Sequence, residues 1–262
     1  MADWHAPQGP FDIPDVPNYI PRRLKPWLFI FFVIIIQFSG GVYLAAASDM
    51  VGTTALMQED ILMAGYASLI GLAINFAVMF RIKFRFSNRT QLLVAGIVLI
   101  AANLICANTE SVPVLVVTCF VAGWFRMQAT LACNSTIQLW LTPVRDMAIF
   151  FCYVYILVDS VIQLSGIATI YTAFFSQWEY MQWIMIGMLA LMMILVMILV
   201  KPVRGPMFIP LLGIDWIGAI LWAGFMMCFT FICVYGNYFD WWDAGEIRAA
   251  ALLGLVCMII NL

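Results

Sequence analysis

Charged residues are scarce in this chain of 262 residues, where Asp, Glu, Lys and Arg together make up 10%. Typical soluble domains carry roughly 25%. Hydrophobic residues make up 65% of the chain, and the mean hydropathy is +1.01. These values exclude an ordinary soluble globular fold. The formal net charge is only -2, so the composition favours neither a nucleic-acid-binding protein nor an acidic disordered one.

Histidine and paired cysteines are missing where metal or redox chemistry would need them. The single histidine, His5, precedes the first apolar run, which excludes a bis-histidine haem and a histidine-based proton relay. The seven cysteines lie inside apolar runs without a CxxC pair, so we expect them to pack as small apolar side chains. No nucleotide-binding loop or nucleophile motif occurs either. The sequence therefore predicts no enzyme, no cofactor and no metal site.

Long apolar runs are what the chain has in abundance. A helix of about twenty residues crosses the hydrocarbon core of a bilayer, and a backbone in lipid must satisfy its own hydrogen bonds. We therefore expect an all-α fold, a polytopic transmembrane helical bundle. The predicted spans are residues 27–47, 61–80, 91–107, 112–139, 147–175, 180–200, 216–235 and 247–262.

The loops between these spans differ in charge. Ten of the twelve basic residues fall at one end of the predicted bundle. The loops of the other end carry acidic residues, with Arg248 as the only basic residue near them. Because lysine and arginine resist translocation, the basic end is predicted to be cytoplasmic. We expect a multi-pass protein of the cell (inner) membrane with a cytoplasmic N-terminus.

Three regions follow along the chain. Residues 1–26 carry six of the eleven prolines, which disfavour helix, so we expect a flexible cytoplasmic Pro-rich tail. Residues 27–200 contain six predicted spans, and residues 201–262 contain a linker and two more. The eighth run ends at Leu262 without a basic flank. We expect the chain to be part of a longer protein, and a natural short form is the alternative.

Two strongly ionisable residues lie deep within the predicted spans. Arg126 is about halfway along the fourth span, and Asp159 is about twelve residues into the fifth. Because these spans run in opposite directions across a short turn, the two residues reach similar depth, and we expect an ion pair. Each charge alone would cost roughly 2.5–3.5 kcal/mol. In the functional interpretation, Asp159 takes up and releases a proton or binds a cationic substrate, and the charge of Arg126 sets the pKa of Asp159. The alternative is a permanently paired structural lock.

Uncharged polar side chains within the spans are candidates for the lining of a substrate cavity. The candidates are Gln37, Asn75, Gln128, Tyr155 and Gln163. Such residues also form hydrogen bonds between helices, worth about 0.6 kcal/mol each. Helix-to-helix bonding is therefore the alternative interpretation for each of them.

Three segments resemble motifs of the major facilitator superfamily. Residues 85–93 (RFSNRTQLL) are similar to its cytoplasmic loop D-R-x-G-R-R-x-x-L. Ala122-Gly123 with Arg126 occupies the fourth-helix region, where the family carries an arginine implicated in proton coupling. Residues 215–219 (DWIGA) resemble the D-W-x-G start of the inserted helix pair in fourteen-helix drug:proton antiporters.

The resemblance implies the N-terminal portion of such a transporter, namely a six-helix half plus two extra helices. Arg85 and Arg89 would belong to a cytoplasmic gating loop. The function implied is proton-coupled efflux of amphipathic or cationic small molecules by alternating access, which needs the missing C-terminal half. The implied partners are the small-molecule substrate, protons and the lipid bilayer and, in a Gram-negative cell, a periplasmic adaptor and an outer-membrane channel. The alternative hypothesis is a non-transporting membrane receptor or scaffold subunit of transporter-like fold.

Overall fold

The computed structural model describes residues 15–17, 20–21, 23–39, 45, 47–51, 55–141, 147–203 and 213–261. Within these residues the fold is all-α, as predicted. The helices are α1 (Lys25–Phe38), α3 (Ala47–Val51), α4 (Gln58–Arg85), α5 (Asn88–Asn108), α6 (Val112–Leu141), α7 (Met147–Phe175), α8 (Glu179–Leu199), α9 (Trp216–Tyr235) and α10 (Gly245–Asn261), with a 3-10 turn at Trp241–Asp243.

Six of the described helices, α4 to α9, are long and apolar enough to cross a membrane. This finding supports a multi-pass membrane protein built as a helical bundle. The described helix α1, with 14 residues, is shorter than the predicted span 27–47, whereas α10, with 17 residues, closely matches the predicted span 247–262. Residues 40–44, which belong to the first predicted span, lie outside the described part of the chain. The predicted side of each end of the bundle stays a prediction.

Polar residues at the ends of the apolar runs define where several helices begin. The Ser87 hydroxyl accepts a hydrogen bond from the Thr90 amide at 3.2 Å and caps α5. The Asp215 carboxylate accepts one from the Gly218 amide at 2.8 Å and caps α9. The Asp60 carboxylate accepts one from the Met57 amide at 3.0 Å at the start of α4. Each cap satisfies a backbone donor that the helix itself leaves unpaired.

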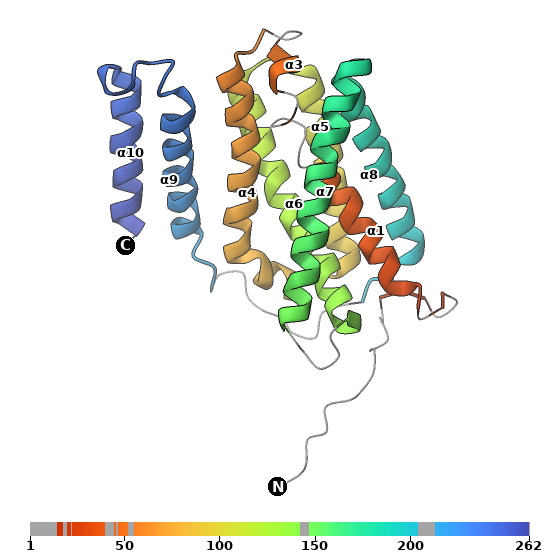
Figure 1. Ribbon diagram of the computed structural model, residues 1–262. Coiled ribbons are helices and arrows are strands. Elements are labelled where there is room, and N and C mark those ends of the chain that lie inside the picture. Colours follow the sequence, from red (N-terminus) through yellow and green to blue (C-terminus); the bar gives the residue numbers. More distant parts are fainter. Residues whose placement is uncertain are drawn as a thin grey trace.

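Successive helices run in opposite directions, so the bundle has two ends (Figure 1). At the basic end, α4 stops and α5 starts around Lys83, Arg85 and Arg89. At the acidic end, α5 stops and α6 starts around Glu110. In Figure 1, α9 and α10 form a pair beside α4, and α8 lies toward the other edge of the bundle.

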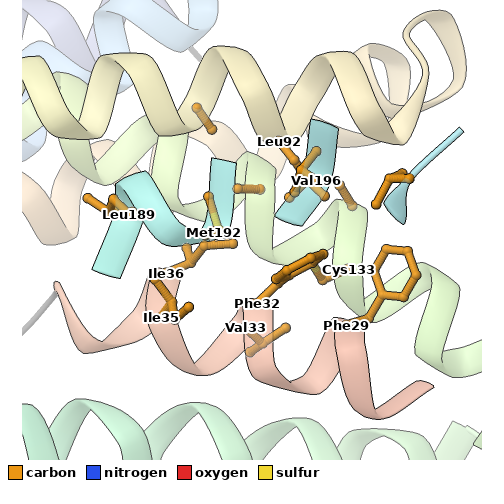
Figure 2. Close-up of a cluster of buried hydrophobic side chains, with 14 of the residues drawn as sticks. Phe29, Phe32, Val33, Ile35, Ile36, Leu92, Cys133, Leu189, Met192 and Val196 are labelled. Carbon is orange, nitrogen blue, oxygen red and sulfur yellow. The ribbon is translucent and has the colours of Figure 1, made fainter. Parts of the chain in front are cut away.

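The main core joins α1, α5, α6 and α8 (Figure 2). Its side chains are nearly or fully inaccessible and include Phe29, Phe32, Val33 and Ile36 of α1, Leu92 of α5, Cys133 of α6, and Leu189, Met192 and Val196 of α8. Lipid tails are as apolar as these side chains, so close van der Waals packing stabilises the contacts more than the hydrophobic effect does. The core places α1 against α6 at the centre of the bundle.

Helices α4 and α6 approach each other through two glycines. A Cβ atom on Gly71 would lie 2.0 Å from the Phe120 carbonyl oxygen, and one on Gly123 would lie 1.9 Å from the Ser68 carbonyl oxygen. Neither position has room for a side chain, so the two backbones touch directly. Small residues serve this purpose at helix contacts in membranes.

The principal contacts among α1 and α4 to α8 form a repeated pattern. α1 packs on α6, and α5 packs on α8. The contact of α4 with α6 corresponds to that of α7 with α1. The contact of α5 with α6 corresponds to that of α8 with α1. Exchanging the set α1, α4 and α5 with the set α6, α7 and α8 therefore maps these contacts onto one another.

The α9–α10 pair attaches to this body through α4 and α6. The Tyr235 hydroxyl of α9 donates a hydrogen bond to the Asp60 carboxylate of α4. The Trp216 ring of α9 stacks on the Trp124 ring of α6, with 6.5 Å between the ring centroids. Both contacts involve buried or half-buried partners on α4 and α6. The pair is therefore docked at both its acidic and its basic end.

Candidate functional site

Helix α7 carries a line of polar side chains on its exposed face. Cys152, Tyr155, Asp159 and Gln163 follow one another at spacings of three and four residues, which places them on one side of a helix. All four are exposed, and Tyr155 is 65% exposed. We call these four residues the α7 polar stripe. Figure 1 shows α7 along the near face of the bundle.

The buried face of α7 explains why the stripe points outward. Val161, Ser165 and Thr169 recur at a spacing of four residues and are buried, with Ser165 and Thr169 fully inaccessible. The Thr169 hydroxyl donates to the Ser165 carbonyl oxygen at 2.7 Å, and the Ser165 hydroxyl to the Ile162 carbonyl oxygen at 2.7 Å. Each hydroxyl is thus satisfied within α7. At 100° per residue these residues lie roughly 80–160° around the helix from Asp159, so the carboxylate points away from the packed side of α7.

Asp159 also lies far from both ends of α7. It is twelve residues from Met147 in a helix of 29 residues, which corresponds to about 18 Å along the axis. A side chain at this depth cannot reach the headgroup region of a bilayer that α7 spans. The stripe therefore presents a carboxylate at mid-membrane depth on a face that the described helices leave open.

Arg126 has the opposite environment. Its side chain is only 2% exposed, and its Nε and Nη2 atoms have no hydrogen-bond partner. It lines a small cavity between α1, α4, α5 and α6. The structure forms no ion pair between Arg126 and Asp159, so the predicted pair needs correction. Counting residues placed the two charges at similar depth, but it did not describe the direction in which each helix face points.

Three of the predicted cavity residues lie inside the bundle. Gln37 of α1 donates to the Thr130 hydroxyl of α6 at 2.7 Å. Gln128 of α6 donates to the Gln91 side-chain oxygen of α5 at 2.8 Å. Asn75 is fully inaccessible, and neither its amide nitrogen nor its oxygen has a hydrogen-bond partner. For Gln37 and Gln128 the contacts match the alternative interpretation, in which polar side chains join helices. Only Tyr155 and Gln163 share the open face with Asp159.

The predicted gating-loop residues lie at the basic end. Arg89 donates through Nη2 to the Met197 carbonyl oxygen of α8 at 3.1 Å. The Arg85 guanidinium lies 6.0 Å from the centroid of the Phe86 ring, at the distance of a cation–π contact. Arg89 therefore connects the start of α5 to the end of α8.

A second polar cluster at the basic end was missed by the sequence analysis. The Lys83 ammonium donates to the Asn88 side-chain oxygen and to the Ala132 carbonyl oxygen, the latter at 3.2 Å. The Asn88 amide donates to the Asp15 carboxylate and to the Thr136 hydroxyl, the latter at 3.0 Å. Asn88 thereby connects the N-terminal tail, α4, α5 and α6.

Asp15 anchors the N-terminal tail in this cluster. Asp15 and Val16 are both buried, and the Asp15 carbonyl oxygen accepts a hydrogen bond from the Lys201 amide at 2.7 Å. Burial raises the pKa of the Asp15 carboxyl group, and the hydrogen bond from Asn88 and the charge of Lys83 partly offset this rise. Most of the tail predicted to be flexible, including residues 1–14, lies outside the described part of the chain. Asp15 and Val16 of this segment pack on the bundle. The sequence feature that could have indicated this packing is Asp15-Val16, an acidic and an apolar residue between two prolines.

The described cysteines are free, and Cys106, Cys119 and Cys133 are buried as expected for small apolar side chains, whereas Cys152 and Cys233 are exposed. The described part of the chain also contains no cluster of three or more His, Cys, Asp or Glu side chains that could hold a metal ion. A scan against models of protein families found no match to this chain, and a search of curated proteins found none either.

Proposed function

We propose that this chain forms part of a secondary active transporter that exports amphipathic or cationic small molecules in exchange for protons. The observation that carries the proposal is Asp159. This carboxylate lies near mid-length of a membrane-spanning helix, on a face that the described helices leave open.

Lipid is a poor environment for this face. An acidic side chain at the centre of a spanning helix costs roughly 2.5–3.5 kcal/mol on insertion scales, and such residues usually face a water-filled cavity or the interior of a bundle. Tyr155 and Gln163 add a hydroxyl and an amide on the same face. We infer that this face borders a hydrated path, closed on its other side by a second helical body. A path of this kind is what a transporter needs.

The repeated contacts of the six helices support the same proposal. Secondary transporters are commonly built from structural repeats, with substrate and ion sites near the bilayer midplane. Here the set α1, α4 and α5 and the set α6, α7 and α8 pair in the same order, although α4 and α5 pack on α6 much more extensively than α7 and α8 pack on α1. This pattern fits a major-facilitator-like half of three plus three helices. In that arrangement α7 lies at the edge of the half, where a second half would meet it.

The surroundings of Asp159 favour a cationic substrate or a proton as its partner. Arg126 does not neutralise it, and the exposed neighbours in the stripe carry no positive charge. A carboxylate without a fixed cation can bind a proton and a cationic ligand in turn. The proposal thus keeps the role predicted for Asp159 and removes Arg126 from it.

The first experiment measures transport in proteoliposomes that contain the full-length protein. An imposed pH gradient should drive uptake of a cationic dye such as ethidium. Asp159→Asn should reduce the proton-driven rate at least ten-fold, because the side chain keeps its shape but loses its charge. Asp243→Asn, which removes an exposed carboxylate at the acidic end, serves as the matched control and should leave the rate unchanged.

The same experiment separates the two hypotheses. A proton-driven rate that survives Asp159→Asn would remove the assigned role of this residue. A wild-type protein that is folded and correctly inserted but carries no dye under any gradient would favour the receptor or scaffold hypothesis. In that case the α7 polar stripe would be the surface that binds a static partner.

A further inference from the structure

Arg126 places a positive charge inside the bundle without a matching negative charge. Two carboxylates are buried among the described residues, and both have other partners. Asp60 accepts hydrogen bonds from the Tyr235 hydroxyl and the Met57 amide. Asp15 accepts one from Asn88 at the basic end. A buried charge that lacks a counter-charge is costly in a low-dielectric interior. None of the described buried carboxylates neutralises Arg126.

Two hydrogen-bond donors of the Arg126 guanidinium also lack an acceptor among the described residues. Nε and Nη2 are inaccessible and have no hydrogen-bond partner among the described residues. Buried donors in native structures are nearly always satisfied, so each exception calls for a physical explanation. Two N–H groups on one edge of a planar guanidinium converge on a single acceptor, as they do when arginine binds an anion.

The cavity that Arg126 lines has a volume of about 30 Å³. Around it lie the side chains of Ser39, Ser68, Asn103, Cys106 and Cys119, which bring hydroxyl, amide and thiol groups but no carboxylate. The volume exceeds the roughly 10–15 Å³ that one water molecule requires. It is far too small for an organic substrate. The cavity is therefore of single-ion size, and its lining combines the Arg126 charge and these polar groups with the apolar side chains of Leu99, Ala102 and Ala122.

We propose that this cavity binds one small monovalent anion of chloride size, with the Nε and Nη2 groups of Arg126 as its principal donors. The anion supplies the missing counter-charge and accepts the unpaired hydrogen bonds. It holds α1, α4 and α5 against α6 from within the acidic half of the bundle. The site is distinct from the α7 polar stripe, so it stands whether or not the protein is a transporter.

The cavity adjoins a larger hollow at the acidic end. Cys106 lines both spaces, and the outer hollow of about 350 Å³ is bordered by Asn108, Glu110 and Trp178 among others. An ion entering from the acidic end therefore has a short path past the Cys106 side chain. Because Glu110 repels anions in the outer hollow, the attraction at the inner site comes from Arg126.

The test compares thermal unfolding of the full-length, detergent-solubilised protein in different sodium salts at equal ionic strength. Chloride and bromide fit a cavity of single-ion size, whereas gluconate does not. Saturating chloride or bromide should raise the Tm by about 2–4 °C relative to gluconate, because a ligand that binds only the folded state stabilises it. Chloride NMR line broadening, displaced by bromide, reports binding directly.

Two variants locate the binding in the cavity. Arg126→Gln removes the charge and should abolish both the chloride-dependent rise in Tm and the line broadening. Ala102→Val keeps Arg126 but fills part of the cavity, so it tests the site even if Arg126→Gln does not fold. It should weaken chloride binding at least ten-fold. Arg248→Gln, which removes an exposed arginine at the acidic end, should keep the full response.

The outcomes are distinguishable. An equal Tm in chloride, bromide and gluconate would overturn the proposal and indicate that water alone satisfies Arg126. A chloride response that persists in both cavity variants would overturn it as well, since the ion would then bind elsewhere. Loss of the response in the cavity variants with retention in Arg248→Gln would support it. None of these results depends on dye transport, so the proposed function and the anion site can fail separately.

Discussion

Asp159 and Arg126 each lie near the middle of a long helix, yet they have opposite environments. Asp159 is exposed on α7, whereas Arg126 is 2% exposed inside the bundle. The difference follows from which face of each helix is packed. Val161, Ser165 and Thr169 bury the other side of α7, and the Arg126 side of α6 lines the cavity that α1, α4 and α5 enclose. Two charges at similar positions along their helices thus lie in different surroundings.

Asp15 gives a prediction about pH. Because burial raises its pKa in the folded state above the ordinary value of 3.8, the folded protein binds a proton more tightly than the unfolded chain does. The contribution of Asp15 to the unfolding free energy should therefore fall as the pH rises above 3.8, and level off once the folded form has ionised. This sign is opposite to that of a salt-bridged aspartate.

The measurement is the difference in Tm between the wild type and Asp15→Asn as a function of pH. The wild type should lose stability relative to Asp15→Asn on going from acidic to neutral pH. Glu179→Gln, which changes an exposed carboxylate at the acidic end, serves as the control and should track the wild type. A difference that stays constant with pH would show that Asp15 has the same proton affinity in both states.

Helices α4 and α6 make the closest contact between elements in the bundle. Their backbones meet at Gly71 and Gly123, where no Cβ atom fits. This contact sets the position of Arg126, which follows Gly123 on α6 by three residues. It also positions α4 for the α9–α10 pair, which docks on α4 through Asp60. A change at the glycine contact should therefore affect the whole bundle.

Gly123→Ala should destabilise the protein strongly. The new Cβ would lie 1.9 Å from the Ser68 carbonyl oxygen, so α4 and α6 must separate, at a cost of about 3 kcal/mol or more. Gly187→Ala is the matched control, since nothing lies within 4 Å of the new atom on α8. Its effect should be neutral or stabilising by up to about 1 kcal/mol, because alanine favours helix.

Unfolding of both variants in mixed micelles with increasing denaturing detergent would give the two free energies. The order of stability of the two variants is the result that tests the prediction. If Gly123→Ala were no less stable than Gly187→Ala, the close contact of α4 and α6 would not be important for stability.

The open face of α7 is mixed, because the α7 polar stripe lies beside exposed apolar side chains such as Ile156, Ile167 and Ile170. The exposed apolar surface of α8, with Ile194 52% and Ile198 65% exposed, suits lipid. The α7 polar stripe does not. A molecule with two such different faces in one membrane should expose the first to lipid and the second to water or to another helical body.

Cysteine accessibility tests this division. Gln163→Cys on the stripe and Ile194→Cys on α8 would be introduced into a chain whose exposed Cys152 and Cys233 are replaced by serine. A membrane-impermeant thiol reagent should label position 163 at least ten-fold faster than position 194, because thiolates react in water. Both variants should reach the membrane in similar amounts. Equal, slow labelling at both positions would place the stripe in lipid and contradict the hydrated path.

Hydropathy located the helices with accuracy. The predicted spans 147–175 and 216–235 coincide with α7 and α9, and the span 180–200 matches α8 within one residue. This agreement has a simple cause, since the length of an apolar run and the caps beside it are local properties. Part of the predicted span 27–47 lies outside the described residues, which contain α1 to Phe38. The largest miss is the Asp15–Asn88 cluster, which joins residues distant in the chain.

The sequence by itself determined the fold class, the positions of most helices and the place of each charge along its helix, because all three depend on hydrophobicity and length along one segment. Only the tertiary structure decided which way each side chain points. It turned Asp159 outward, enclosed Arg126 without a counter-charge and buried Asp15, because the direction of a helix face depends on which neighbours pack against it. That packing arises from contacts such as Gly71 with Phe120, between helices separated by tens of residues.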